Sequence, residues 1–314
     1  MDTDTIIEKS TLFISKNKSS ETKGKFIIAS TLAAVILIIS VLFIIISIIV
    51  YNGWSIFSWE FVSSFPTDGM TKGGIFPAII GTFILVIVMS IAAVPFGTIT
   101  ALYLTEYAKE NSKFAAAVRF SVRTLAVVPS IIFGLFGLGF FIQFIGTGMD
   151  KTFNNGELHW GQPNILWASL TMALLTLPVI IVSVEEALKT VPRELREASL
   201  ALGATKWQTI RKVVLPESIS GIMTGTILAV SRGAGEVAPI LFTGAAYYLA
   251  TLPKSVTDQF MNLGYHIYIM STQSSDVEKT MPIQFATTLV LLLLTISLNI
   301  VAIIIRSRIR RKKL

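Results

Sequence analysis

The sequence predicts an all-α membrane protein with six transmembrane helices. Composition is the first observation: 53% of the residues are hydrophobic and only 14% are charged, whereas a soluble domain carries roughly 25% charged residues. Segment length is the second, because a helix needs about 20 apolar residues to cross the hydrocarbon core of a membrane. The uneven distribution of Lys and Arg between alternate loops is the third. A soluble globular fold is therefore excluded.

Five apolar segments are each long enough for one spanning helix. A sixth, from Ile219 to about Ala250, is too long for one simple span and too short for two. The first segment is longer than the roughly 7–15 residues of a signal-peptide core, and no small-residue cleavage site follows it. We therefore expect it to be a retained span. The five segments are Phe26–Val50, Ile75–Leu104, Leu125–Ile145, Ile165–Val184 and Pro282–Ile305.

The positions of Lys and Arg predict the orientation of these helices. One set of alternate loops and termini holds 21 of these cations, and the loops between them hold 4. Cytoplasmic loops carry an excess of Lys and Arg, so both termini are predicted to be cytoplasmic. The net charge of +7 therefore reports topology rather than affinity for an anion. By the same argument the C-terminal RSRIRRKKL is a membrane-flanking basic cluster, not a nucleic-acid site.

Residues that carry chemistry are scarce. The chain has no cysteine, which excludes disulfides, thiolate metal sites and cysteine catalysis. His159 and His266 fall in predicted outer loops, without a carboxylate or second histidine at ligand spacing, and we expect both to be solvated. We find no phosphate-binding Gly-Lys-Ser/Thr loop and no zinc-binding HExxH motif. We therefore expect no catalytic residue, no metal site and no cofactor bound by this chain.

The third apolar segment contains residues that affect helix packing. Pro129 is expected to bend this helix by freeing a carbonyl group. Gly134, Gly137 and Gly139 are expected to let neighbouring backbones approach closely, since small residues favour helix contacts in lipid. We favour this packing role over direct lining of a pathway.

The charged loop before the fifth span predicts a helix, a sharp corner and a second helix. Pro192 suits a first helical position, and Gly203 is placed to end that helix in the left-handed conformation. Thr205 and Gln208 have the spacing of a capping box. Pro216 is expected to stop the second helix before the membrane.

Each of these two helices has an apolar and a polar face on a helical wheel. We expect the apolar faces to be buried and the polar faces, with Leu200 among the charges of the first, to be offered to a partner. The predicted apolar faces are Leu195, Ala198, Ser199 and Leu202 in the first helix, and Trp207, Ile210, Val213 and Val214 in the second. The polar face of the second comprises Lys206, Gln208, Thr209, Arg211 and Lys212.

The stretch EASLALGATKWQTIRKVVLP resembles the EAA loop of ABC-importer permeases, in which Glu-Ala-Ala is followed at fixed spacing by Gly, Ile and Leu-Pro. Ser199 stands in for the second Ala of that motif and Val213 for its Ile. The resemblance implies a coupling helix that docks in a groove of a cytoplasmic ATPase. The residues it assigns to this coupling loop are Glu197, Ala198, Ser199, Leu200, Gly203, Val213, Leu215 and Pro216.

A narrower resemblance, to phosphate-importer permeases and more to their A-type than their C-type subunit, covers roughly residues 75–313. It rests on PFGTITALYLTEYA, VPSIIFGLFGLG and SRGAGEVAPILFTGA as well as the EAA loop. It implies the type I (MetI-like) architecture and a place in a bacterial inner membrane. The implied partners are a homologous second permease in a heterodimer, two ATPase subunits that use ATP, and an extracytoplasmic phosphate-binding protein.

These readings divide the chain into four parts. A permease core spans residues 75–305 and contains the EAA coupling loop at 192–216. The remaining parts are a cytoplasmic tail at 1–25, a first transmembrane helix at 26–50, and a basic cytoplasmic tail at 306–314.

One charge pair is expected inside the membrane. Arg232 and Glu236 are four residues apart and so share one side of a helix, with Arg232 about 21 Å beyond Ser218. An ionisable residue at that depth faces protein or water rather than lipid. We favour Arg232 as a positive charge in the translocation path, held by Glu236, over a structural ion pair. Helix-breaking residues at Gly233, Gly235 and Pro239 would explain the over-long sixth run.

Other functions stay open from residue chemistry alone. Arg232 suits any small oxyanion, so an ABC permease for sulfate, molybdate or another small solute is an alternative to one for phosphate. A secondary transporter driven by an ion gradient would need no ATPase, and the coupling motif argues against it. A membrane enzyme would need clustered acids or a Ser–His pair near the interface, which the sequence does not offer.

Overall fold

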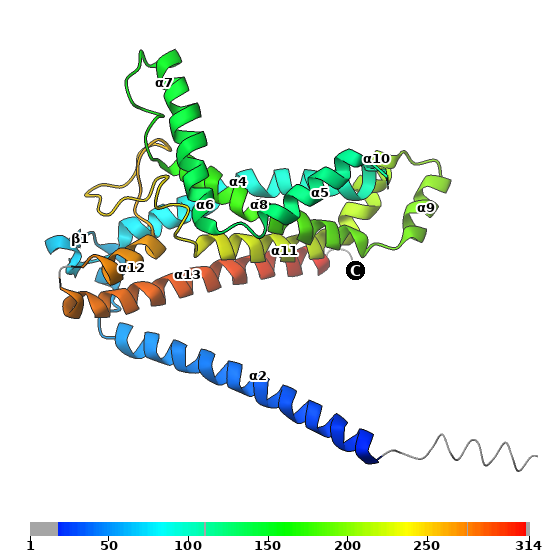
Figure 1. Ribbon diagram of the computed structural model, residues 1–314, viewed down its shortest axis with the longest axis horizontal. Coiled ribbons are helices and arrows are strands. Elements are labelled where there is room, and N and C mark those ends of the chain that lie inside the picture. Colours follow the sequence, from blue (N-terminus) through cyan, green and yellow to red (C-terminus); the bar gives the residue numbers. More distant parts are fainter. Residues whose placement is uncertain (1–17, 110, 275, 312–314) are drawn as a thin grey trace, which may run out of the picture. The chain divides into compact units, whose positions relative to one another are not determined.

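The computed structural model describes residues 18–109, 111–274 and 276–311. Within them it is mainly helical, with six helical stretches long and apolar enough to cross a membrane (Figure 1). The predicted fold class is confirmed. Residues 1–17 of the expected N-terminal tail and 312–314 of the expected basic tail lie outside the described part. The six stretches are Gly24–Gly53, Phe76–Tyr107, Ser130–Phe153, Ile165–Lys189, Lys206–Ala234 and Val277–Arg308.

The elements follow one another without a large sheet. The first half of the chain contains α2 (Lys18–Gly53), α3 (Trp59–Ser63), β1 (Pro66–Thr67), η1 (Asp68–Met70), β2 (Lys72–Gly73), α4 (Phe76–Leu102), η2 (Tyr103–Tyr107), α5 (Lys113–Leu125), α6 (Ser130–Phe136), η3 (Gly137–Gly146) and α7 (Thr147–Phe153). The second half contains α8 (Ile165–Lys189), α9 (Arg193–Ala201), α10 (Lys206–Thr209), η4 (Ile210–Val214), α11 (Leu215–Ala234), α12 (Leu263–Thr272) and α13 (Val277–Arg311). The segments η2, η3 and η4 are π-helical, and η1 is a 3₁₀ turn.

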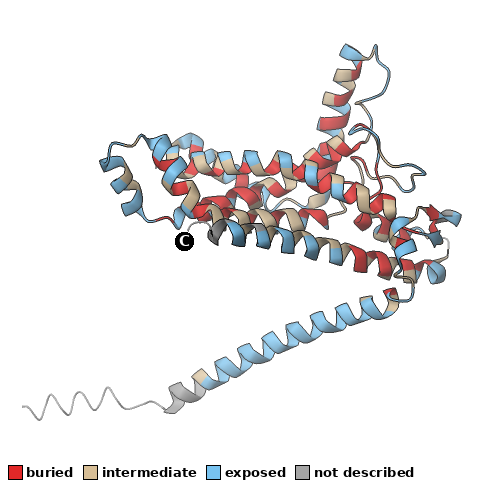
Figure 2. Cartoon of the chain, turned by 180° about the vertical axis from the view of Figure 1, so that it is seen from behind, coloured by how far each residue is buried: buried red, intermediate tan, exposed pale blue. Residues whose placement is uncertain are grey.

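Residues 1–52 and 53–314 form two separate compact units, and the first is described here through α2. Its apolar side chains are exposed along almost the whole helix (Figure 2). A helix that is apolar all round suits lipid or the interior of a protein rather than water. It begins at Lys18, before the apolar run itself, because helical backbone continues into the polar residues that precede Phe26.

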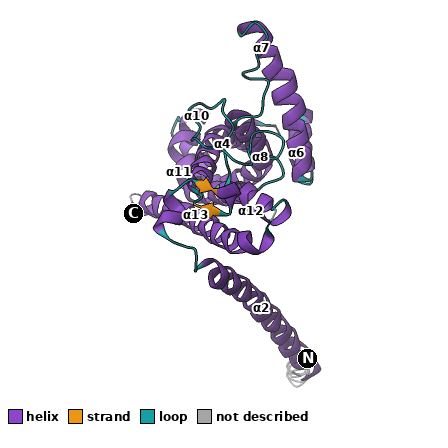
Figure 3. Cartoon of the chain, turned by 90° about the vertical axis from the view of Figure 1, so that its left-hand side faces the viewer, coloured by secondary structure: helices purple, strands orange, loops and turns teal. Residues whose placement is uncertain are grey.

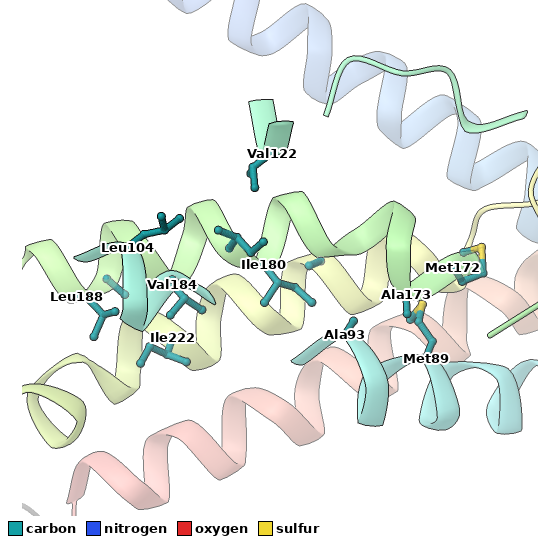
Figure 4. Packing of buried hydrophobic residues seen from close by; sticks show 14 of the residues in the cluster. Met89, Ala93, Leu104, Val122, Met172, Ala173, Ile180, Val184, Leu188 and Ile222 are labelled. Carbon is teal, nitrogen blue, oxygen red and sulfur yellow. The ribbon is translucent and has the colours of Figure 1, made fainter. Parts of the chain in front are cut away.

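The core of the second unit lies around α8. This helix packs against α4 on one side and α11 on another (Figure 3). Figure 4 shows Met89 and Ala93 of α4 close to Met172 and Ala173 of α8, with Ile180 further along. These side chains are all buried. Helix α8 is therefore the central helix of this unit, and α4 and α11 both pack against it.

The start of α8 is fixed by the loop that follows α11. The first N–H groups of a helix have no partner within it, and here they bond to distant carbonyl groups. The N–H of Ile165 donates to the carbonyl of Asp258 and that of Leu166 to the carbonyl of Val256, both at 2.9 Å. The side chain of Asn164 caps the helix by accepting from the N–H of Trp167. The loop after α11 is therefore part of the core structure.

The third span differs from its prediction. Residues up to Leu125 belong to α5, an amphipathic helix, and the spanning helix begins only at Ser130 and continues to Phe153. Pro129 is the N-cap of α6 rather than a bend inside it. Proline disfavours helical backbone in the residue before it, so the chain turns at this point instead of continuing from α5.

Two of the three glycines in this span allow close packing, as predicted. A Cβ on Gly134 would lie 3.0 Å from the backbone of Pro239, and one on Gly137 would overlap the side chain of Thr171 in α8. A Cβ on Gly139 would meet no atom within 4 Å. The packing prediction for Gly139 is therefore wrong, because this position faces away from neighbouring elements.

A buried carboxylate at the end of the third span, Asp150, binds the loop that follows α7. Asp150 is almost fully buried and accepts hydrogen bonds from the N–H groups of His159, Trp160 and Gly161, at 3.0, 2.8 and 2.6 Å. Three donors satisfy a carboxylate that would be costly to bury alone. The loop is therefore tied to the end of its helix, while the side chain of His159 is exposed as predicted.

The predicted exposure of His266 is wrong. This residue lies in α12, where it is only 3% exposed, and neither ring nitrogen has a hydrogen-bond partner. Burial lowers its pKa from 6.5 to about 4, because a dry environment disfavours the charged ring. The cause of the misprediction is α12 itself, which packs with α13 and α4 where a simple loop was expected.

The only strands in the described residues are β1 and β2, of two residues each, which form a hairpin before α4. Pro66 pairs with Gly73 and Thr67 with Lys72 in antiparallel register. Asp68 and Lys72 form an exposed ion pair at 2.9 Å across its turn. This hairpin is a small addition to an otherwise helical protein.

Candidate functional site

The predicted corner between two helices is present. Gly203 has a φ of 82°, the left-handed conformation expected after α9, and L-residues with a Cβ disfavour that conformation. The capping box is also present: the Thr205 hydroxyl accepts from the N–H of Gln208, and the Gln208 side chain accepts from the N–H of Thr205. Pro192 is the N-cap of α9, one residue before its predicted place.

The apolar face of α9 is not buried. None of its residues is buried, Leu195 is 44% exposed, and Leu202, just after the helix, is more exposed still. The prediction of a buried face is wrong for the part of this chain that the structure describes, because α9 leaves the bundle and no element in that part covers it (Figure 2).

Two residues of the second helix exchange their predicted environments. Trp207 is 55% exposed, although we expected it to be buried, whereas Thr209 is buried and its hydroxyl lies 2.9 Å from that of Ser199. Trp207 belongs to the first turn, ahead of the packed part of the helix. Ile210 and Val214 are buried as predicted.

Pro216 does not end the second helix. The helix runs without a break from Lys206 to Ala234, and Pro216 lies in its interior. Proline removes one N–H donor and its ring clashes with the carbonyl four residues earlier. The π-helical segment η4 directly before Leu215 widens the turn, which accommodates the ring, so the second helix of the corner continues into the membrane helix without a break.

The residues of the EAA match lie on both sides of this corner. Glu197, Ala198 and Leu200 are exposed on α9, and Ser199 is half-buried beside Thr209. On the other side, Val213, Leu215 and Pro216 are half-buried where η4 continues into α11. The exposed part of the match is thus confined to α9 and the corner at Gly203.

Two ion-pair groups near this corner were missed by sequence reasoning. Arg119 of α5 binds Glu185 of α8 at 3.1 Å, and Lys189 binds the same carboxylate at 3.2 Å. Arg196 of α9 binds Glu106 of η2 at 2.9 Å. The partners of the two arginines are 66 and 90 residues away in sequence. A signal was present, since Glu106 and Glu185 are acids at the ends of apolar segments.

Arg232 and Glu236 lie close together, at the end of α11 and just beyond it. Nε of Arg232 is 3.8 Å from Oε1 of Glu236, and the arginine side chain is 72% exposed. The helix ends at Ala234 with Gly235 as its C-cap, and Pro239 lies in the turns that follow. A long contact and high exposure make this a weak ion pair in the single chain.

A cavity of about 290 Å³ adjoins this pair. Its walls come from the turn before α6, from Leu175, Thr176 and Val179 of α8, and from Ala229, Arg232, Gly233 and Glu236. The two charges therefore lie at a hollow bordered by helices of the central bundle. The described residues contain no group of three or more His, Asp or Glu side chains that could hold a metal ion.

A bundle of helices long and apolar enough to span a membrane, with an exposed two-helix corner, defines the class of multi-pass membrane proteins. Residues 93–312 match the family of binding-protein-dependent transport system inner membrane components. The chain belongs to this family, the permeases of ABC importers.

Named relatives agree with this assignment. The chain is 31% identical over 238 residues to the Probable ABC transporter permease protein YqgI of Bacillus subtilis, covering 72% of this chain and 76% of that protein. It is 40% identical over 169 residues to the phosphate transport system permease protein PstA of Mycobacterium leprae, covering 54% of this chain and 50% of the relative. The chain thus spans about half the length of the mycobacterial protein.

Solved structures share the fold. A chain of a bacterial alginate ABC transporter superposes with a TM-score of 0.64 at 15% identity, covering 92% of this chain and 96% of that one. A chain of the MetNI methionine ABC transporter gives 0.55 at 19% identity, covering 75% and 97%. These likenesses support the predicted MetI-like architecture.

Proposed function

We propose that this chain imports inorganic phosphate as one permease of an ATP-driven transporter in a bacterial inner membrane, with both termini in the cytoplasm. The observation that carries the transport mechanism is the uncovered α9 and its corner, placed on a continuous helix that runs into the bundle. Phosphate as substrate is supported by the similarity to PstA proteins and by the exposed guanidinium of Arg232.

The coupling role belongs to the residues of the EAA match. In this proposal α9 docks on a cytoplasmic ATPase, with Glu197, Ala198 and Leu200 on the contact surface. Ser199 and Gly203 hold the corner, and the half-buried residues Val213, Leu215 and Pro216 connect it to α11. Because the helix does not break at Pro216, a displacement of its first turn, next to the corner, also displaces α11.

The pathway role belongs to Arg232 and Glu236. A guanidinium offers paired donors that match an oxyanion, and Arg232 is exposed beside a hollow of the bundle. Glu236 limits how tightly an anion binds, since it competes for the same donors. The helix ends at Ala234 with Gly235 as its C-cap, and the chain turns through Pro239, so non-helical backbone follows Arg232 beside the hollow.

The other subunits of the proposed transporter are separate proteins. The chain forms half of the path, and a homologous second permease supplies the other half. Two ATPase subunits hydrolyse ATP, an extracytoplasmic binding protein delivers phosphate, and this chain binds no cofactor and performs no covalent chemistry. The similarity to YqgI, whose name specifies no substrate, keeps another oxyanion or a small solute as the second candidate.

Uptake of labelled phosphate tests this proposal. The chain is expressed with its ATPase, second permease and binding protein in cells that lack other phosphate importers. We expect ATP-dependent uptake that unlabelled phosphate abolishes and that sulfate and molybdate leave unchanged. Uptake of sulfate or molybdate in preference to phosphate would overturn the substrate.

Variants of the charge pair test the pathway role separately. If Arg232 meets the anion, the double variant Arg232→Met/Glu236→Met folds and hydrolyses ATP with its partners but transports poorly. Arg232→Lys keeps the charge without the planar fork and should retain part of the uptake. Full uptake by the double variant, normalised to protein in the membrane, would leave the pair as scaffold only.

A further inference from the structure

Helix α9 is held to the bundle by polar contacts rather than by packing. It has no buried residue, so its orientation depends on a few specific bonds. Near its end, Ser199 bonds to Thr209 at 2.9 Å. Where the second helix begins, the Lys206 ammonium lies 5.2 Å from the centre of the Tyr107 ring. A further contact, in the middle of α9, is made by Arg196.

Arg196 joins α9 to two other elements at once. Its Nη2 donates to Oε1 of Glu106 at 2.9 Å and to the carbonyl of Leu188 at 2.8 Å. Its Nη1 donates to the carbonyl of Val191, with a longer contact to Pro192 at 3.4 Å. Glu106 lies in η2, which continues α4, and Leu188 lies in the last turn of α8. One guanidinium therefore connects α9 to the ends of α4 and α8.

The chemistry of this contact requires arginine. The last carbonyl groups of a helix lack partners within it and carry a partial negative charge, so α8 favours a cation at this end. Only the planar guanidinium has enough donors in fixed directions to reach a carboxylate and several carbonyls together. The side chains are 18% and 9% exposed for Arg196 and Glu106, which protects the pair from screening by salt.

We propose that Arg196 is a positioning residue for coupling: its bonds to Glu106 and to the end of α8 transmit movement of α9 to α4 and α8. This inference rests on the proposed function. The two helices that receive the movement pack against each other, and α8 also borders the cavity at Arg232 through Leu175, Thr176 and Val179. The contact thus joins the docking surface to the walls of the pathway.

Three single variants and one double variant separate the two links. Glu106→Gln weakens the link to α4 and leaves the carbonyl contacts of Arg196 in place, so it should have a moderate effect. Arg196→Lys keeps a charge but cannot hold all its acceptors, and Arg196→Gln loses both links. The double variant Arg196→Gln/Glu106→Gln should be no worse than Arg196→Gln alone, since both changes break one connection. Arg123→Gln removes an exposed arginine from α5 and is the matched control.

The measurement uses the whole transporter in proteoliposomes. We expect Arg196→Gln to assemble with its partners yet move roughly tenfold or more less phosphate per ATP hydrolysed, the order expected when charged hydrogen bonds are lost. Arg123→Gln should keep the wild-type ratio. A wild-type ratio in both Arg196→Gln and Glu106→Gln would overturn the inference.

Hydrogen exchange gives a second result that does not depend on the substrate. In Arg196→Gln, amides of residues 193–201 should exchange at least about tenfold faster, while those of 168–184 keep their protection. Equal loss of protection in both segments would make Arg196 a general fold residue and overturn its positioning role. Failure of the wild type to import phosphate would count against the proposed function alone, because the exchange result still tests the contact.

Discussion

Helices α8 and α9 are separated only by residues 190–192, yet their surroundings are opposite. α8 is buried along most of its length between α4 and α11, whereas α9 has no buried residue. Composition accounts for part of the difference, because α8 is apolar on all sides and charged only at Glu185, Glu186 and Lys189, whereas α9 is apolar on one face and charged on the other. The rest of the difference is that α4 and α11 cover α8, whereas no described element covers the apolar face of α9.

Residues of α8 maintain the fold, whereas the uncovered residues of α9 are available to a partner. A helix of nine residues such as α9 is marginal on its own, since isolated helices shorter than about 12–15 residues are unstable in water. Its contacts through Arg196 and Ser199 keep it in place without covering its apolar side. We therefore expect changes in α8 to reduce stability, and changes in α9 to reduce coupling.

The largest effect is expected in the middle of α8. Ile180 is fully buried in the main core cluster, and Ile180→Ala leaves a cavity that should lower the free energy of unfolding by about 2–5 kcal/mol. Thermal unfolding of the purified chain in detergent measures this loss. An unfolding temperature equal to that of the wild type would contradict the assignment of α8 as the centre of the core.

A pH-dependent loss of similar size is expected from His266. Its pKa is lowered by burial from 6.5 to about 4, so between these values the unfolded chain binds a proton that the folded chain does not. The contribution of His266 to stability should be constant above about pH 6.5, fall as the pH decreases towards 4, and amount to a loss of about 3 kcal/mol at about 1.4 kcal/mol per pH unit. Unfolding measured across this range checks the slope.

The two histidines supply the control for this experiment. His266→Phe removes the group that titrates and should flatten the slope between pH 6.5 and 4, whereas His159→Phe changes an exposed side chain and should leave it unchanged. The same slope in the wild type and in His266→Phe would assign the pH dependence to other groups.

A smaller effect is expected at the corner after α9. Gly203 has a φ of 82° and open space around it, so Gly203→Val should cost about 1–2 kcal/mol through backbone strain alone. We expect weaker assembly with the ATPase and less uptake per ATP, with little change in the amount of protein in the membrane. Asparagine tolerates the left-handed conformation, so Gly203→Asn should retain most of the coupling. Equal uptake by the Val and Asn variants would remove the conformational argument.

The smallest effect on stability is expected on α9 itself. Leu195 is 44% exposed, and Leu195→Ala should change the free energy of unfolding by about 0.5 kcal/mol or less, as for an ordinary surface position. Its effect should appear instead in affinity for the ATPase, measured by co-purification at increasing salt. A loss of stability comparable to that of Ile180→Ala would remove the contrast between the two helices.

Local chemistry made much of this protein predictable from its sequence. The six spans follow from the length of their apolar runs, and the corner at Gly203 and the capping box of Thr205 and Gln208 are confirmed. Each depends on residues within a few positions of one another. The family resemblance likewise rested on motifs with short, fixed spacing, and the match to residues 93–312 confirms it.

The tertiary structure alone decided which faces are covered. Trp207 and Leu195 are exposed, and Thr209 and His266 buried, against the helical-wheel and loop predictions, because amphipathicity predicts that a face differs from its opposite but not that a partner lies in the same chain. Arg196 and Glu106 meet across 90 residues, and no spacing rule joins positions so far apart. Pro216 remains inside a continuous helix, with the π-helical segment η4 directly before it, and whether a proline ends a helix or is accommodated in it depends on what the rest of the fold holds in place.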